Sequence, residues 1–247
     1  MASCETSADT RSIAGLSETY ARWRNSRLGR ITDALEEHLA LELLGPVDHL
    51  DVLDVGCGDG ALASVLAHRG ARVTGLDADP RMLAAARARA EAASFGLDLV
   101  HGRAEALPFP DGAFDRVVAV TVLCFVHEPD RAIAEMVRVL KPGGRLVVGE
   151  LGRWSLWAAI RRVRGWLGAS TWRAARFRTA GDLQRLLEGH GLAVRETRGS
   201  IYYPPCGLGA SLMAPVDPWL GQRTTLGAAF IVLSAAKPLP HTDSGIR

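Results

Sequence analysis

Three glycines follow directly after an apolar run, in the segment Val52-Leu53-Asp54-Val55-Gly56-Cys57-Gly58-Asp59-Gly60. The run predicts a buried strand, and the Ala- and Leu-rich residues after Gly60 predict a helix. Glycines in such a turn allow positive φ angles and let a ligand approach the backbone at the carboxyl end of the strand. The first N–H groups of the helix then favour an electron-rich or anionic group. The pattern therefore predicts a ligand site at the glycine turn.

The glycine turn is compatible with two classes of cofactor. Gly56, Gly58 and Ala61 satisfy the loose dinucleotide pattern G-x-G-x-x-G/A, and Asp77 follows at about the 20-residue distance where an acid binds a ribose diol. These features indicate a bound ribose and leave the cofactor open. A nicotinamide-dependent reductase would normally also need a proton donor such as a Tyr-x-x-x-Lys pair, and none of the three tyrosines has a lysine four residues later.

Short apolar runs alternate with helical patterns around this turn, which is typical of βαβ units and a parallel sheet. The predicted strands are Asp51–Val55, Arg72–Leu76, Leu97–His101, Phe114–Val120, Arg145–Gly149, Leu192–Arg198 and Ala228–Ala236. The predicted helices are Ile31–Leu44, Ala61–His68, Pro80–Ala93, Pro129–Leu140 and Thr179–His190. The Pro- and Gly-rich stretch from Tyr202 to Gly221 is expected to be a long loop.

The composition of the chain is that of an ordinary globular protein. Its 247 residues include 29 Lys+Arg and 27 Asp+Glu, giving a net charge of +2, and 48% of them are hydrophobic. The longest apolar runs fall short of the ~20 residues that span a bilayer, and the first residues do not resemble a secretory signal, so we expect a cytoplasmic protein. Four scattered cysteines without a C-x-x-C pair predict no metal site, and the near-neutral charge gives no reason to expect nucleic-acid binding.

Five motifs between about residues 45 and 150 occur in a specific order, namely Val52–Gly60, Arg72–Leu83, Gly102–Phe109, Phe114-Asp115 and Val139–Leu146. Together they closely resemble the class I S-adenosylmethionine-dependent methyltransferases, especially the type 11 branch that includes the ubiquinone and menaquinone biosynthesis enzymes. The resemblance implies an α/β, Rossmann-like sheet of seven mostly parallel strands, with helices on both faces and an antiparallel last strand. It also implies S-adenosyl-L-methionine as cofactor and S-adenosyl-L-homocysteine as product.

The resemblance gives matching positions a role in cofactor binding. Asp54 and the turn Gly56, Cys57, Gly58 and Gly60 would lie under the methionyl part, although Cys57 can simply be a small residue beside the ligand. Asp77 would hold the ribose hydroxyls, because two carboxylate oxygens can accept both protons. The Thr121 carbonyl would face the methionyl amine.

The adenine would be bound by the segments after the second and third strands. The resemblance implies that Ala78 and Met82 line the ring and that Ala104 donates its N–H to a ring nitrogen. Many relatives have an aspartate where this chain has Arg103, which carries no acceptor. Glu105 or a main-chain carbonyl must therefore accept from the adenine amino group.

The acceptor site is expected outside the five motifs, in residues 1–30, 151–178 and 200–222. The implied organisation is an N-terminal segment 1–44, a methyltransferase domain 45–237 with insertions 151–178 and 200–222, and a loose tail 238–247. Nine of the 15 aromatic residues follow Glu150, which predicts a small, partly apolar acceptor. Between residues 153 and 185, eight arginines and a single acid predict an anionic group on the acceptor.

The arginine-rich stretch has two other interpretations. A helix carrying Leu156, Ile160, Val163 and Leu167 could dock on an acidic membrane surface, or it could be a packed helix with a solvated arginine face. The expected partner is a small-molecule methyl acceptor, and the protein is expected to be a monomer or a homodimer.

The sequence singles out no general base. His127, Glu150, Tyr202 and Tyr203 are candidates because they follow predicted strands on the acceptor side. Each also has a structural alternative, such as a hydrogen-bonded carboxylate for Glu150 or packing for the tyrosines. A protein that binds the cofactor without catalysis remains an alternative, because the residues of binding and of methyl transfer are the same.

Overall fold

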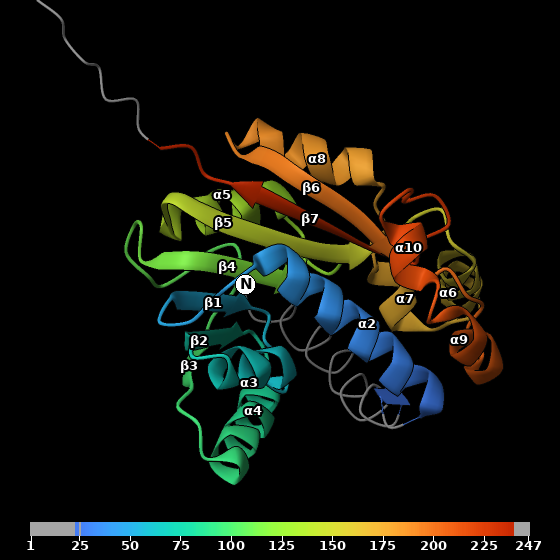
Figure 1. Ribbon diagram of the computed structural model, residues 1–247, viewed down its shortest axis with the longest axis horizontal. Coiled ribbons are helices and arrows are strands. Elements are labelled where there is room, and N and C mark those ends of the chain that lie inside the picture. Colours follow the sequence, from blue (N-terminus) through green and yellow to red (C-terminus); the bar gives the residue numbers. More distant parts are fainter. Residues whose placement is uncertain (1–22, 25, 240–247) are drawn as a thin grey trace, which may run out of the picture.

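A seven-stranded sheet forms the centre of the computed structural model, which describes residues 23–24 and 26–239 (Figure 1). Its order is β3-β2-β1-β4-β5-β7-β6, and β7 runs antiparallel to both of its neighbours. The other neighbouring pairs are parallel. The strands are β1 Asp51–Val55, β2 Arg72–Asp77, β3 Asp98–His101, β4 Phe114–Val120, β5 Leu140–Leu151, β6 Ala193–Ser200 and β7 Phe230–Ala236. The predicted sheet is confirmed.

Helices cover both faces of the sheet, because alternate residues of each strand point to opposite sides. Leu53 of β1 lies in the core with α5 and α8, whereas Val52 lies in the core with α2 and α3. The helices are α2 Arg27–Leu44, α3 Ala61–His68, α4 Pro80–Ala93, α5 Pro129–Val139, α6 Leu156–Trp166, α7 Ser170–Ala174, α8 Ala180–Gly189, α9 Gly207–Met213 and α10 Asp217–Gly221. In the part of the chain that the structure describes, none of them is long and apolar enough to cross a membrane.

Two elements begin earlier than predicted, for local reasons. Helix α2 starts at Arg27 because the Ser26 hydroxyl accepts a hydrogen bond from the Gly29 N–H at 3.0 Å, which caps the first turn. Strand β5 starts at Leu140, directly after α5. It therefore includes the tight turn around Gly143, whose φ angle of 77° favours glycine. At its other end β5 extends to Leu151, two residues beyond the prediction.

The expected loop from Tyr202 to Gly221 is wrong, because this stretch contains α9 and α10. The buried Asp217 carboxylate holds α10 against the end of β6. It accepts hydrogen bonds from the Ser200 hydroxyl at 2.6 Å and from the N–H groups of Ile201 and Tyr202 at 2.9 Å. These bonds satisfy a buried charge and explain the fixed path of this segment.

The outermost parts of two predicted segments, residues 1–22 and 240–247, lie outside the described residues.

Candidate functional site

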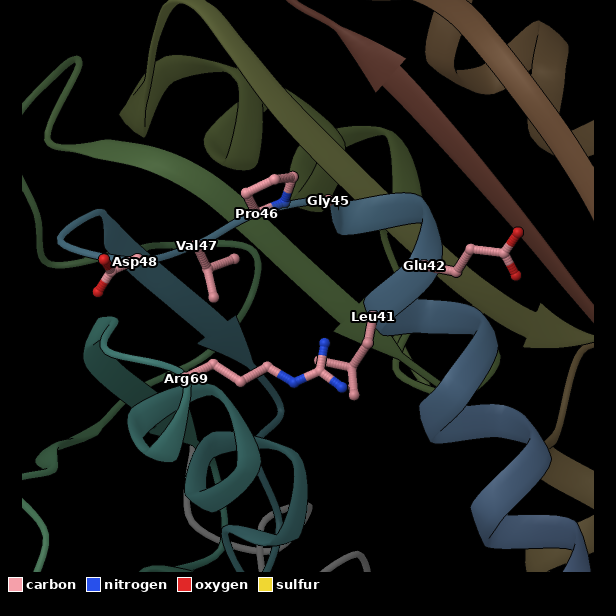
Figure 2. Close-up of a pocket in the computed structure, with 7 residues that line it drawn as sticks. All are labelled: Leu41, Glu42, Gly45, Pro46, Val47, Asp48 and Arg69. Carbon is pink, nitrogen blue, oxygen red and sulfur yellow. The ribbon is translucent and has the colours of Figure 1, made fainter.

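A hollow at the amino end of β1 does not coincide with the predicted site. Figure 2 shows its lining residues, Leu41, Glu42, Gly45, Pro46, Val47, Asp48 and Arg69. They come from the loop before β1 and from the ends of α2 and α3. Ligands of open parallel sheets bind at the carboxyl ends of the strands, so the glycine turn at the opposite edge is the better candidate.

The glycine turn has the backbone geometry that the sequence predicts. Gly56, Gly58 and Gly60 have φ angles of 72°, 55° and 76°, in the left-handed region that favours glycine. A Cβ on Gly56 would lie 2.4 Å from Cγ2 of Val122, whereas a Cβ on Gly58 would meet nothing within 4 Å. The N–H of Gly56 donates to the Leu76 carbonyl at 2.7 Å, which ties the turn to β2. The backbone is thus open for a ligand at Gly58.

Asp77, the last residue of β2, connects the turn with the start of α4. One carboxylate oxygen accepts from the Gly58 N–H and the other from the Asp79 N–H, both at 2.8 Å. Each oxygen keeps lone-pair capacity for a hydroxyl proton. Asp79 in turn caps α4 by accepting from the Arg81 N–H at 2.9 Å. The carboxylate of Asp77 is therefore oriented beside the turn before any ligand binds.

Asp54 is a buried carboxyl group directly below the turn, in β1. Its Oδ2 has no hydrogen-bond partner among the described residues. Burial, together with the nearby charge of Asp77, raises the pKa of Asp54 to about 7. The same surroundings raise the pKa of the Cys57 thiol, which therefore stays protonated. A cationic ligand group would compensate the two carboxylates.

The positions predicted for an adenine lie after β2 and β3. Ala78 is exposed, Met82 is half-buried in α4, and Ala104 and Glu105 are buried. The Glu105 carboxylate pairs with the exposed Arg103, with 3.3 Å between Oε1 and Nη2.

The chain resembles known methyltransferases in sequence and in structure. A family model described as "Methyltransferase domain" matches residues 53–148. A ubiquinone biosynthesis O-methyltransferase from Methylobacterium sp. (strain 4-46) is 33% identical over 201 residues, which cover 78% of this chain and 81% of that protein. The chain is a class I S-adenosylmethionine-dependent methyltransferase. A possible histamine N-methyltransferase from Thermotoga maritima superposes on the methyltransferase with a TM-score of 0.68 at 25% identity, covering 89% of this chain and 95% of that one.

One structural neighbour carries a different activity in its name. The [4+2]-cyclase SpnF has a TM-score of 0.62 and 25% identity, covering 82% of this chain and 80% of its own. The fold alone therefore does not fix the reaction of a family member.

Glu150 differs from the other candidate bases of the methyltransferase. It lies in β5, fully buried, and neither carboxylate oxygen has a hydrogen bond of good geometry among the described residues. Burial raises the pKa of Glu150 to about 7, although the Arg178 charge and the backbone of Leu123 lower it. Nη1 of Arg178 is also buried and lacks a partner in the described chain. Burial and the Glu150 charge raise the pKa of the neighbouring Cys124 thiol, whereas the charges of Arg178 and Arg161 lower it.

The other three candidates have less suitable surroundings. His127 is exposed. The Tyr202 hydroxyl donates to the Thr224 carbonyl, and the Tyr203 hydroxyl shares a hydrogen bond of 3.0 Å with Thr32. Burial raises the pKa of both tyrosines to about 12, so both keep their protons near neutral pH.

The described parts of the three predicted acceptor segments meet in an aromatic cluster, formed by Trp23, Trp157, Trp172 and Tyr203. The Trp157 ring centroid lies 6.4 Å from those of Trp23 and Tyr203, and its Nε1–H donates to the Tyr203 carbonyl at 2.8 Å. The Arg161 guanidinium lies over the rings of Trp157 and Trp172, at 5.0 and 4.7 Å. These residues are far apart in the sequence, which therefore does not indicate that they meet.

Glu36 is a polar residue near the site that the sequence did not single out. It lies off the apolar stripe of α2, where a solvated carboxylate is the ordinary expectation. In the structure, burial and the charge of Asp33 raise the pKa of Glu36 to about 8, while the Arg161 charge lowers it. Glu36 therefore adds a polar group to the edge of the aromatic cluster.

An ion-pair network ties α2 to the glycine turn. Arg24 pairs with Asp33 of α2 and, through Nη1, with Asp59 of the turn at 2.8 Å. Arg89 of α4 binds the other oxygen of Asp59 at 2.5 Å. Glu36 lies one helical turn from Asp33, so the part of α2 that the network ties to the glycine turn also carries Glu36.

Proposed function

We propose that the methyltransferase holds S-adenosylmethionine along the glycine turn. The cofactor carries sulfonium and ammonium cations, which suit the buried, unpartnered carboxyl group of Asp54. Asp77 binds the ribose hydroxyls with the oxygens that already orient the turn. The remaining contacts come from Gly56, Cys57, Gly58 and Gly60, from the Thr121 carbonyl, and from Ala78, Met82, Ala104 and Glu105 around the adenine.

We infer that the acceptor is a small aromatic compound with a hydroxyl and an anionic group. The observation that carries this inference is the meeting of three separate chain segments in the aromatic cluster around Arg161. Aromatic walls favour a ring, and the arginines of residues 151–178 favour a negative charge. In this organisation residues 45–237 form the methyltransferase domain, and residues 151–178 and 200–222 are its acceptor-binding insertions.

The carboxylate of Glu150 is the group best placed to take the hydroxyl proton. It lies at the carboxyl end of β5, next to the end of β4, where the Thr121 N–H donates to the Gly149 carbonyl at 2.7 Å. One hydroxyl could donate to Glu150 and accept from Nη1 of Arg178, which would satisfy groups that are costly to leave unpaired. The described contacts show both groups buried, so opening of the segment that carries Arg178 would precede binding.

Methyl transfer then needs alignment and one proton acceptor. When bound, the cofactor supplies a methyl group made electrophilic by the sulfonium. The aromatic cluster and Arg161 orient the ring, and alignment of this kind supplies ~7–11 kcal/mol of a barrier. Glu150 would take the proton that the acceptor hydroxyl loses on methylation, and the demethylated cofactor would leave as S-adenosylhomocysteine. Arg178 stabilises the negative charge on the oxygen.

Transfer of a radiolabelled methyl group from S-adenosylmethionine tests the proposal. The panel pairs hydroxybenzoates with the corresponding phenols that lack the carboxylate, and aromatic amines serve as the third class. We expect labelled ethers, with a lower KM for the hydroxybenzoates. Arg161→Gln should remove that preference, whereas Arg87→Gln, an exposed change in α4, should leave it unchanged. Labelled amines alone would overturn the assignment of the acceptor.

The [4+2]-cyclase neighbour makes binding without methyl transfer the second candidate. Cofactor binding measured by calorimetry, with no label transferred to any member of the panel, would favour it.

A further inference from the structure

Helix α6 turns its apolar stripe outward. Leu156, Val163 and Leu167 lie seven and four residues apart, a spacing that places them on one side of the helix. All three are exposed, and Trp166 beside them is 84% exposed. The opposite side carries Trp157 and Ala158, which are buried. In the described structure α6 packs through this buried side, as one interpretation of the sequence expected. Of its predicted stripe, Leu156, Val163 and Leu167 are exposed, whereas Ile160 is half-buried.

The neighbouring helices present apolar side chains as well. Leu208 and Leu212 of α9 are 71% and 70% exposed, and Trp219 of α10 is 56% exposed. Figure 1 shows α6, α7, α9 and α10 gathered at one end of the molecule, beyond the carboxyl end of β5. We call the exposed side chains of α6, α9, α10 and their flanks the apolar tip, namely Trp154, Leu156, Val163, Trp166, Leu167, Leu208, Leu212, Val216 and Trp219.

Arginines flank the apolar tip. Residues 151–178 contain seven arginines and no acid. Arg162 and Arg164 fall on either side of the α6 stripe, since they lie one residue before and after Val163 on the helix. Arg153 and Arg223 lie over the rings of Trp154 and Trp219, at 5.3 and 4.1 Å. Asp217, the first residue of α10 and the one acid between residues 200 and 223, is buried and bonded to the end of β6.

We propose that the apolar tip docks on an anionic lipid bilayer. Tryptophan and leucine flanked by arginine is the arrangement of helices that lie in the bilayer interface, where the ring enters the headgroup region and the guanidinium contacts phosphate. A second copy of the chain is less suitable, because it would bring two arginine-rich surfaces together. A nucleic acid would satisfy the charge but would leave the exposed leucines in water.

Docking in this way would leave the aromatic cluster one helix away from the bilayer, behind α6. Trp157 lies on the inner side of the same helix whose outer side carries Leu156 and Val163. If the proposed aromatic acceptor carries an apolar chain, it could reach the cluster from the lipid. Lipid binding itself does not depend on the identity of the acceptor, so the two proposals fail separately.

Sedimentation of the full chain with vesicles tests the docking. The vesicles contain phosphatidylcholine alone or with about 30% phosphatidylglycerol. Each basic residue near an anionic surface increases the binding constant about fivefold. We expect binding to the anionic vesicles only, weakened about 30-fold or more by Arg162→Glu with Arg164→Glu. Trp166→Ser with Leu167→Ser should weaken it about tenfold. The matched controls are Arg87→Glu and Leu239→Ser, which change an exposed arginine of α4 and an exposed leucine after β7.

The outcomes separate the occupants of the surface. Equal binding of all variants, or no binding to anionic vesicles, overturns the proposal. A dimer in sedimentation equilibrium that Trp166→Ser abolishes would assign the tip to a second copy, and binding of DNA in place of vesicles would assign it to nucleic acid. Unchanged thermal unfolding and circular dichroism of the variants establish that lost binding does not reflect lost structure.

Discussion

Replacement of Asp77 by alanine should abolish most of the cofactor affinity while leaving the fold intact. The carboxylate orients the glycine turn through the Gly58 N–H and the start of α4 through the Asp79 N–H, each at 2.8 Å. In the proposed complex the same oxygens accept both ribose hydroxyl protons. Alanine therefore removes the ribose contacts and releases Gly58, whose N–H lies in the turn that carries the ligand.

The size of the effect follows from the number of bonds lost. A hydrogen bond to a charged group contributes about 1.5–3 kcal/mol, so two ribose bonds amount to about 3–6 kcal/mol. At about 1.4 kcal/mol per factor of ten, the Kd for S-adenosylmethionine should rise by roughly 10²–10⁴. The freed N–H groups remain near solvent, so the free energy of unfolding should fall by only about 1 kcal/mol.

Asp79→Ala provides the matched control. It removes a neighbouring carboxylate and the cap of α4, which should cost about 1 kcal/mol of stability. It removes no proposed ribose contact, so the Kd should change less than about threefold. Isothermal calorimetry with S-adenosylmethionine, S-adenosylhomocysteine and NADH in turn measures these values. If Asp77→Ala bound S-adenosylmethionine within threefold of the wild type, or if the two variants lost equal affinity, the assignment of the ribose site would be wrong.

Four other substitutions test separate parts of the site. Gly56→Ala should lower the free energy of unfolding in urea by about 1–3 kcal/mol, because its Cβ would lie 2.4 Å from Val122 and its φ is 72°. Gly58→Ala has open space around its Cβ. It should raise the Kd for the cofactor, measured by calorimetry, while lowering the free energy of unfolding less than Gly56→Ala does. Glu150→Gln should lower kcat about 10²-fold or more and remove the rise of the pH–rate profile near pH 7, with cofactor Kd unchanged; a kcat within threefold of wild type would exclude Glu150 as base. The raised pKa of Asp54 means that the unfolded chain loses its proton first as pH rises above about 4, so the cofactor-free protein should lose stability up to about pH 7. Asp54→Asn should flatten this decline of Tm, and an equally steep decline in the variant would contradict the assignment.

The parallel part of the fold is predictable because its signals are local. Each strand from β1 to β4 is an apolar run bounded by turn residues, and Pro80 and Pro129 mark the first turns of their helices. The positive φ angles of Gly56, Gly58 and Gly60 also follow from the type of residue. Asp79 directly precedes Pro80 and caps α4, which is a local effect of the same kind.

The acceptor side is less predictable because long-range contacts determine it. The path of residues 202–221 depends on Asp217, which in the sequence is an ordinary acid before a proline and in the structure binds three groups of β6 and its end. Glu36 meets the charge of Arg161 across more than a hundred residues of chain. Neither contact leaves a periodic pattern in the sequence.

The orientation of α6 shows the limit of periodicity most directly. Both sides of this helix carry large apolar residues, with Leu156 and Val163 on one and Trp157 on the other. The spacing of apolar residues identifies an apolar side of a helix. When two sides are apolar, it does not show which one packs against the protein. The choice is made by Tyr203, whose carbonyl accepts from the Trp157 indole at 2.8 Å and so gives the buried ring a polar partner. Leucine and valine need no such partner, so Leu156 and Val163 are left exposed on the surface that we propose docks on lipid.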